Sequence, residues 1–301
     1  MSIVRLRKIT YSVSGALVLA SIAAILMFGF NLGIDFTGGS LLEVEYIKSR
    51  PAIEVLQKSL DGVGLGKISI QPTGEKGLIL RFRDVSEQEH QALLSILARG
   101  EDVQETLVEQ RFDSIGPVVG KELQRKAWIA LSLVVFLIIL YITWAFRKVS
   151  RPIASWKYGI CAIIALIHDI TIPSGVFAFL GEFKGVEIDT LFVTALLTIL
   201  GFSVHDTIVV FDRVRENLKK HPREDFEGVV DISVKEVMVR SISTSLAILF
   251  VLIALFLFGS QSIQWFSFAL ILGIIFGTYS SIFLASPLLI TWEKFTRRRN
   301  P

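Results

Sequence analysis

Asp206 is the residue whose position most requires a chemical explanation, because it lies inside the apolar run from Ala195 to Phe211. A carboxylate in hydrocarbon costs several kcal/mol unless it is paired, hydrated or protonated. Proton or ion handling is therefore the first hypothesis for this residue. The alternative is a polar side chain that only locks two helices together through a buried hydrogen bond.

Two further charged residues could act with Asp206. Asp169 follows His168 and, in a helix, lies about 16 Å into another apolar run. It could instead be structural, bonded to a neighbouring hydroxyl or to backbone where Pro173 frees a carbonyl. Arg240 stands at a depth similar to that of Asp206, so an ion pair between them is geometrically reasonable. Arg240 could equally extend to the lipid headgroups.

A narrow polar face accompanies Asp206 on its own helix. Thr194, Thr198, Gly201 and His205 follow the spacing i, i+4, i+7 and i+11, whereas the rest of the helix is Leu, Ile, Val and Phe. A polar stripe inside a membrane helix is expected to face protein or water. We therefore expect the two threonines and His205 to support the site.

Membrane helices must position these residues. The chain of 301 residues is 52% hydrophobic with a mean hydropathy of +0.59, which is typical of a mostly bilayer-spanning protein. A helix needs about 20 apolar residues to cross the hydrocarbon layer. Six runs qualify: Ile9–Phe30, Ala127–Phe146, Tyr158–Leu180, Thr190–Phe211, Val237–Phe258 and Phe266–Ile290.

The distribution of Lys and Arg predicts the orientation of these helices. The N-terminus, the segments 147–157 and 212–240, and the C-terminal tail are basic, whereas 181–189 and 259–265 together hold only Lys184. Positive segments remain in the cytoplasm, so both termini are predicted to be cytoplasmic. The first run is too long for a signal peptide and is interpreted as an uncleaved helix.

The long segment between the first two helices is predicted to be a small α+β domain. Strands at 41–46, 67–71, 78–83 and 103–112 alternate with helices at 51–60 and after Ser86, which with Glu89 forms a capping box. A turn is predicted at 72–74. The order βαββαβ suggests a ferredoxin-like sandwich. The predicted domains are 1–30 (N-terminus and first helix), 31–126 (periplasmic domain), 127–290 (helices two to six) and 291–301 (basic cytoplasmic tail).

The sequence contains no recognisable enzyme site. It has one cysteine, Cys161, no nucleotide-binding glycine motif, and no nucleophile triad or metal cluster. We therefore predict that the protein is not an enzyme, that it uses no cofactor or metal and that it binds no nucleic acid.

Four motifs carry a resemblance to a known family. The first is FNLGIDFTGGS at 30–40, where Gly33, Gly38 and Gly39 permit positive φ around Asp35. The others are GPVVGKEL at 116–123, ALIHD at 165–169 and LLTILGFSVHDTIVVFDRVREN at 196–217. Together they resemble the SecD/SecF protein-export family over nearly the whole chain. His205 departs from the asparagine usual in this family, and the residues just before Arg240 are less typical.

The resemblance implies one half of a resistance-nodulation-division-like transporter in the bacterial inner membrane. Such a chain pairs with a SecD subunit, works with the Sec channel SecYEG and with YajC and YidC as further candidates, and acts on unfolded preprotein with the proton-motive force. By analogy the proton pathway includes Asp206, Arg240 and, less directly, Asp169. The alternatives are a proton-coupled exporter of small molecules, and a scaffold whose polar residues only fix helix packing.

Overall fold

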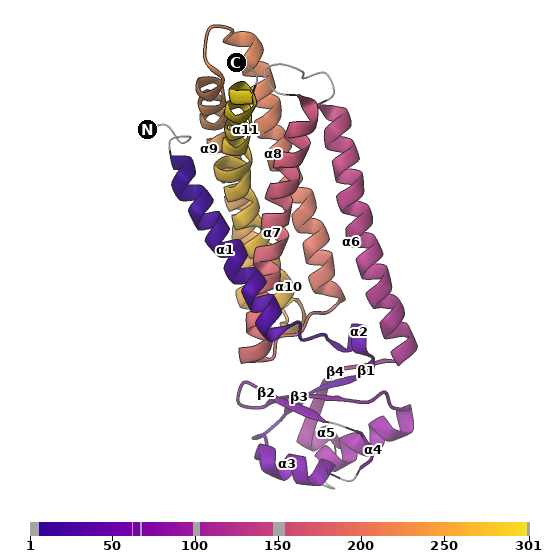
Figure 1. Cartoon of the computed structure of the whole chain (residues 1–301). Helices are drawn as coiled ribbons and strands as arrows, with labels where there is room; N and C mark the ends of the chain where they lie inside the picture. Colours follow the sequence, from indigo (N-terminus) through magenta and orange to yellow (C-terminus); the bar gives the residue numbers. More distant parts are fainter. Residues whose placement is uncertain (1–5, 62, 67, 99–102, 147–153, 300–301) are drawn as a thin grey trace. The chain divides into compact units, whose positions relative to one another are not determined.

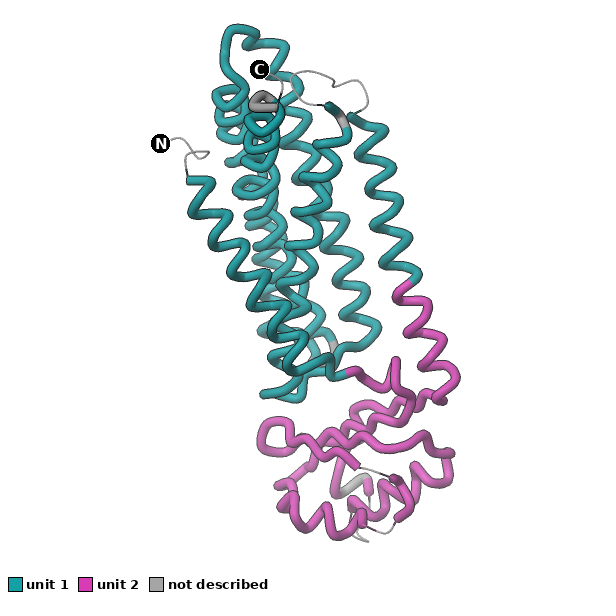
Figure 2. Tube along the Cα trace, viewed as in Figure 1, with its two compact units in different colours: residues 1–31, 129–301 teal, residues 32–128 magenta. Residues whose placement is uncertain are grey.

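The computed structural model describes the chain except for residues 1–5, 62, 67, 99–102, 147–153 and 300–301. The chain forms two compact units, which Figure 2 colours separately. The helical unit comprises residues 1–31 and 129–301, and the smaller α+β unit comprises residues 32–128. The extreme ends of the predicted cytoplasmic termini lie outside the described residues.

Figure 1 labels the elements along the chain. The helical unit contains α1 (Arg7–Phe28), most of α6 (Pro117–Ala145), α7 (Ser155–Lys184), α8 (Thr190–Lys220), α9 (Phe226–Phe258), α10 (Gln261–Ser280), the π turn η2 (Ser281–Ala285) and α11 (Ser286–Arg299). The smaller unit contains α2 (Ile34–Thr37), β1 (Gly39–Tyr46), α3 (Ile53–Leu60), β2 (Ser69–Thr73), β3 (Gly77–Phe82), α4 (Glu87–Leu97), α5 (Val103–Thr106) and β4 (Leu107–Ile115).

Within the described part of the chain, six helices are long and apolar enough to cross a membrane, as the sequence predicts. Several of them, including α6, α8 and α9, extend well past the predicted ends. α8 continues through the charged residues after Phe211 as far as Lys220, and α9 begins at Phe226, not at Val237. Lys, Arg and Glu are good helix formers, which favours the continuation of α8. The start of α9 is capped by Asp225, whose side chain accepts a hydrogen bond from the Gly228 amide at 2.9 Å. The sixth span consists of α10, the π turn and α11.

The core of the helical unit lies where α7 and α8 pack against α10 and the π turn. Near one end of the bundle, Phe146, Tyr158 and Phe211 are almost fully buried and pack ring against ring. Small residues allow close approach elsewhere. A Cβ atom on Gly273 of α10 would lie 2.1 Å from Cγ1 of Ile199 on α8, so only glycine fits that contact.

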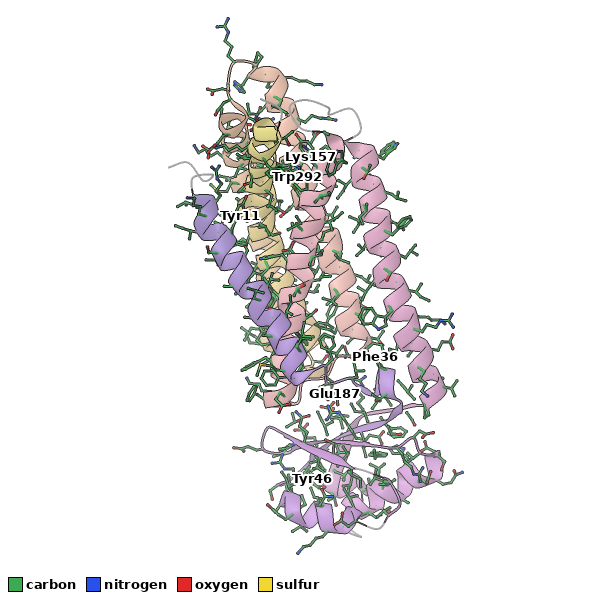
Figure 3. All side chains as sticks on the ribbon, viewed as in Figure 1. Tyr11, Phe36, Tyr46, Lys157, Glu187 and Trp292 are labelled. Carbon is green, nitrogen blue, oxygen red and sulfur yellow. The ribbon has the colours of Figure 1, made fainter. Side chains whose placement is uncertain are left out.

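α1, α6 and α9 lie at the edge of the bundle and expose most of their apolar side chains. α1 packs along α7, where Tyr11 also bonds to Thr291 of α11 at 2.9 Å. Tyr11, Lys157 and Trp292 are labelled in Figure 3. The exposed apolar surfaces of these three helices are what lipid or another membrane subunit would cover.

The smaller unit has a four-stranded antiparallel sheet in the order β2-β3-β1-β4. Its core is made by alternate strand residues such as Leu42 and Val44, and by Leu56 and Leu93 of α3 and α4. The capping box is confirmed: Ser86 accepts from the Glu89 amide, and the Glu89 carboxylate accepts from the Ser86 amide at 2.9 Å.

Two local predictions in the smaller unit are wrong. β2 continues through Thr73, so the turn falls at residues 74–76, because Pro72 and Thr73 pair with β3. The last strand begins at Leu107, since Val103–Thr106 form the short helix α5. Pattern reasoning locates elements more securely than their boundaries.

The glycine motif forms a tight junction inside the smaller unit. Gly38 and Gly39 have φ of +77° and +125°, whereas Gly33 is extended at −70°, so the expectation of positive φ is wrong for Gly33. A Cβ on Gly38 would lie 2.7 Å from Cα of Pro117, and one on Gly120 would lie 2.8 Å from the amide nitrogen of Gly38. The first two sequence motifs therefore pack against each other at the start of α6.

Candidate functional site

Asp206 lies at a small cavity between α8, α9 and α10. The cavity has a volume of about 100 Å³, and its polar lining includes Ser203, His205, Thr244 and Ser245. Oδ2 of Asp206 accepts a hydrogen bond from Thr278 at 3.3 Å, and Oδ1 lies 3.5 Å from Nδ1 of His205. Both distances are long for hydrogen bonds, so these partners are weak. The Asp206 side chain is 16% exposed, and Asp206 lines the cavity.

Asp169 is held quite differently, at the centre of the helical unit. Its side chain is fully buried, and its Oδ2 accepts hydrogen bonds from Ser203 of α8 at 2.5 Å and Ser280 of α10 at 2.7 Å. Its Oδ1 lies 2.8 Å from Nδ1 of His168. These contacts match the alternative that Asp169 joins neighbouring hydroxyls, although Ser203 also lines the cavity of Asp206.

Hydroxyl groups continue from this carboxylate into the π turn. Thr207 and Ser281 are 2.8 Å apart, and Ser281 also donates to the Gly277 carbonyl at 3.0 Å. The Ser286 hydroxyl bonds the Ser281 carbonyl at 2.8 Å. π turns leave backbone groups without their usual helical partners and often occur at functional sites. In this protein the π turn directly follows Ser280, which bonds the buried Asp169.

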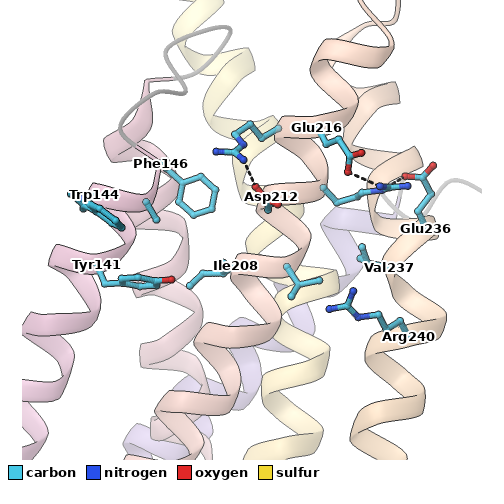
Figure 4. A pocket seen from close by; sticks show the side chains of 13 residues that line it. Tyr141, Trp144, Phe146, Ile208, Asp212, Glu216, Glu236, Val237 and Arg240 are labelled. Carbon is cyan, nitrogen blue, oxygen red and sulfur yellow. Dashed lines mark hydrogen bonds and ion pairs between the residues drawn. The ribbon is translucent and has the colours of Figure 1, made fainter.

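Of the two alternatives for Arg240, the ion pair with Asp206 does not form among the residues that the structure describes. Arg240 lines a second, open cavity of about 670 Å³ between the end of α6, the C-terminal part of α8 and residues 236–240 of α9 (Figure 4). In that cavity Asp212 pairs with Arg215, and Arg213 pairs with both Glu216 and Glu236. The rotation of α9 directs Arg240 to this cavity, which sequence depth alone could not reveal.

The polar stripe of α8 lies on the outside of the helical unit. Thr194 and Gly201 are exposed, Thr198 is partly exposed, and the His205 side chain is 70% exposed. The two threonines bond the carbonyls four residues earlier, at 2.9 and 2.8 Å. The stripe therefore faces away from this chain's own core.

The remaining predicted residues, Gly33, Asp35, Gly38 and Gly39, belong to the smaller unit. Gly38 packs there against Pro117 at the start of α6. Sequence reasoning missed Ser203, Ser280 and Thr278, the hydroxyls that contact the two acids. Their only sequence signal is a small polar residue within an apolar run beside a predicted acid. No cluster of metal-binding side chains occurs within the described ranges.

The described residues form six helices of membrane-spanning length that carry two carboxylates, the buried Asp169 and Asp206 at a polar cavity. These features define a multi-pass membrane protein. The chain belongs to the SecD/SecF family of protein export membrane proteins. The model of the SecD/SecF C-terminal region matches residues 96–295, and that of the SecD/SecF GG motif matches residues 23–46.

Individual relatives agree with this membership. The chain is 43% identical to the protein translocase subunit SecF of Thermobaculum terrenum, over 97% of this chain and 94% of that one. It is 40% identical to the SecF of Synechocystis, over 98% and 95%. The crystal structure of SecDF from Thermus thermophilus, described as a translocon-associated membrane protein, superposes with a TM-score of 0.83 at 29% identity. That match covers 98% of this chain but 39% of the SecDF chain.

Proposed function

We propose that this chain is an accessory subunit of the Sec preprotein translocase, which pairs with a SecD subunit and uses the proton-motive force in late steps of export. The observation that carries the proposal is Asp206, an acid with weak partners at a polar cavity inside a membrane helix bundle. Family membership supplies the cargo, since relatives are named as translocase subunits. SecYEG, YajC and YidC are the proposed neighbours, and unfolded preprotein is the proposed cargo.

The partner proposal is supported by what the helical unit leaves uncovered. A stripe that contains Thr194, Gly201 and His205 faces outward, where lipid is a poor neighbour for polar groups. A second subunit that packs there would cover the stripe and bring its own polar groups to the cavity of Asp206. The SecDF chain, of which this chain matches 39%, is long enough to supply such a second half.

The proposed energy source is the proton that reaches Asp206. A charge that crosses the membrane potential releases about 2.3 kcal/mol per 100 mV. Protonation would remove the negative charge that the Thr278 hydroxyl and His205 now contact. It would also change the field at Arg240, so α8, α9 and α10 would prefer a different arrangement. Asp169 belongs to this proposed pathway as the deeper acid.

The proposed topology places both termini in the cytoplasm of a bacterial inner-membrane protein. The smaller unit would then be a ferredoxin-like periplasmic domain. Its element order and the strand order β2-β3-β1-β4 support this assignment. As a domain without a proposed catalytic role, it would contact the emerging polypeptide and move with the membrane helices.

The decisive experiment is Asp206→Asn, which keeps size and hydrogen bonding but removes titration. We expect loss of potential-stimulated preprotein export in inverted membrane vesicles that lack the wild-type subunit. Glu224→Gln is the control, because Glu224 is an exposed acid in the segment after α8 and lines neither cavity. Normal stimulation by a fully assembled Asp206→Asn complex would show that the proton carrier is elsewhere.

A further inference from the structure

We propose that Ser203 is a relay residue through which the buried Asp169 exchanges protons with the cavity of Asp206. The proposal rests on the proposed proton-driven function and adds a residue and a direction of transfer to it. In this scheme, protons pass between the two membrane acids through the cavity water and the Ser203 hydroxyl.

The position of Ser203 carries the inference. Its hydroxyl is 2.5 Å from Oδ2 of Asp169, and the same residue lines the cavity that Asp206 also lines. Ser203 precedes Asp206 by three residues on α8, so both side chains lie on one side of that helix. Gly277 of α10 lies against this contact, where a Cβ would be 3.4 Å from Cβ of Ser203 and 3.8 Å from Oδ2 of Asp169.

The cavity can hold the water that such a relay needs. Its volume is about 100 Å³, whereas a water molecule takes about 30 Å³ of liquid, so a short chain of waters fits. The residues that line the cavity include Asp206, Ser203, Thr244 and Ser245, whose polar groups would bind these waters. Hydrogen-bond partners for a water chain are therefore present on several helices.

The transfer balances with water as the only co-reactant. Protonated Asp206 gives its proton to the water chain, which gives a proton to Oγ of Ser203. Ser203 releases its own proton to Oδ2 of Asp169 along the existing hydrogen bond. Asp206 thereby becomes negative and Asp169 neutral, while the serine and the waters end as they began.

Ser280 provides an internal comparison. It donates to the same Oδ2 of Asp169 at 2.7 Å, but it is not among the residues that line the cavity. If the serines only anchor Asp169, their loss should have similar effects. If Ser203 relays protons, its loss should have a much larger effect on the rate at which Asp169 changes protonation.

The test is time-resolved infrared spectroscopy of the full chain in nanodiscs after a pH jump. The carboxyl C=O band of protonated Asp169 is assigned by its absence in Asp169→Asn. We expect Ser203→Ala to slow the appearance of this band at least tenfold, Ser280→Ala to slow it less than twofold, and Ser203→Thr to remain near wild type. If Ser203→Ala fails to fold, Ser203→Cys, which keeps the size but donates weakly, makes the same comparison.

Equal slowing by the two alanine variants, or no slowing by either, would overturn the relay. The infrared result is independent of export. A wild-type complex that conducts no protons would contradict the proposed function, yet the band would still report whether Ser203 connects the acids. Conversely, the Ser203→Ala complex could retain potential-driven proton flux, with the Asp169 band appearing at the wild-type rate. That result would agree with the proposed function and contradict the relay.

Discussion

The two membrane acids differ in how firmly the protein holds them. Asp206 has contacts of 3.3 and 3.5 Å and some exposure, so it can gain or lose a proton with little rearrangement. Asp169 is fully buried and has three contacts between 2.5 and 2.8 Å on its own helix, α8 and α10. Charge-assisted hydrogen bonds are stronger than neutral ones, so neutralising Asp169 would loosen three helices at once.

Substitutions of Arg240 would show whether positive charge alone, or also the shape of the guanidinium group, is required at the second cavity. Arg240→Lys keeps the charge but loses the planar fork, so we expect it to retain more potential-stimulated export than Arg240→Met. The measurement is the same vesicle assay. Lys235→Gln is the control on α9, because Lys235 is exposed and bonded to Asp231. Equal loss in the Lys and Met variants would mean that the guanidinium geometry, not the charge, is required.

At the scale of elements, the contact between α8 and α10 sets the position of the site. Gly273 and Gly277 lie one turn apart on α10 and face Ile199 and Ser203 of α8. Such small-residue faces allow helices in a membrane to approach closely. Thr278 and Ser280 follow directly, so the same contact brings both hydroxyls to the acids.

Gly273→Ala should therefore destabilise the helical unit by about 1–3 kcal/mol, the usual cost of overpacking. Thermal unfolding in detergent measures this loss. Gly15→Ala is the control, because nothing lies within 4 Å of a Cβ at that position on α1. Adding Ile199→Ala should recover part of the loss by removing the clashing atoms. Additive destabilisation in the double variant would contradict the packing account.

The start of α4 is a second element whose stability depends on a few polar groups. Arg83 and the amide and hydroxyl of Ser86 bond the Glu89 carboxylate and lower its pKa from 4.5 to about 2. Because the pKa is depressed in the folded state, this contribution to stability is present above pH 4.5. It is lost as the pH falls from about 4.5 toward 2.

In Glu89→Gln, the stability of α4 should therefore depend less on pH between about 4.5 and 2 than in the wild type. Hydrogen exchange of the α4 amides at a series of pH values, corrected for intrinsic rates, measures it. Glu54→Gln on α3 is the control, an exposed acid far from this cap in sequence. Because the group is exposed, added salt should weaken the effect. An unchanged pH profile in Glu89→Gln would show that the cap makes no net ionic contribution.

At the scale of the whole molecule, the proposed function predicts that the two units lie in different environments. We expect a cysteine at Lys58, exposed on α3, to react with an impermeant thiol reagent in intact spheroplasts. A cysteine at Lys219, near the end of α8, should react only after lysis. The native Cys161 is fully buried and adds little background. Reaction of Lys219→Cys in intact spheroplasts, with protection of Lys58→Cys, would show that the orientation is the reverse of the one proposed.

Sequence reasoning located the spans, the capping box and the two acids, because each has a local signal: an apolar run, a spaced Ser and Glu, or a charge in hydrocarbon. It could not assign the partners of Asp169, since serines in apolar helices have no periodic signal. It allowed an ion pair between Arg240 and Asp206 because their depths agree, but depth does not fix helix rotation. The end of β2 was missed because strand pairing extended it through Pro72.

The π turn at Ser281–Ala285 has a consequence for how mutations should be interpreted along the sixth span. A π turn contains one residue more than an α-helical turn, so positions after it are rotated by about 100° relative to the phase before it. Sequence tolerance measured by saturation mutagenesis should therefore follow one helical phase in residues 261–280 and a shifted phase in residues 286–299. A single period fitted across both would conceal which side of the span faces lipid.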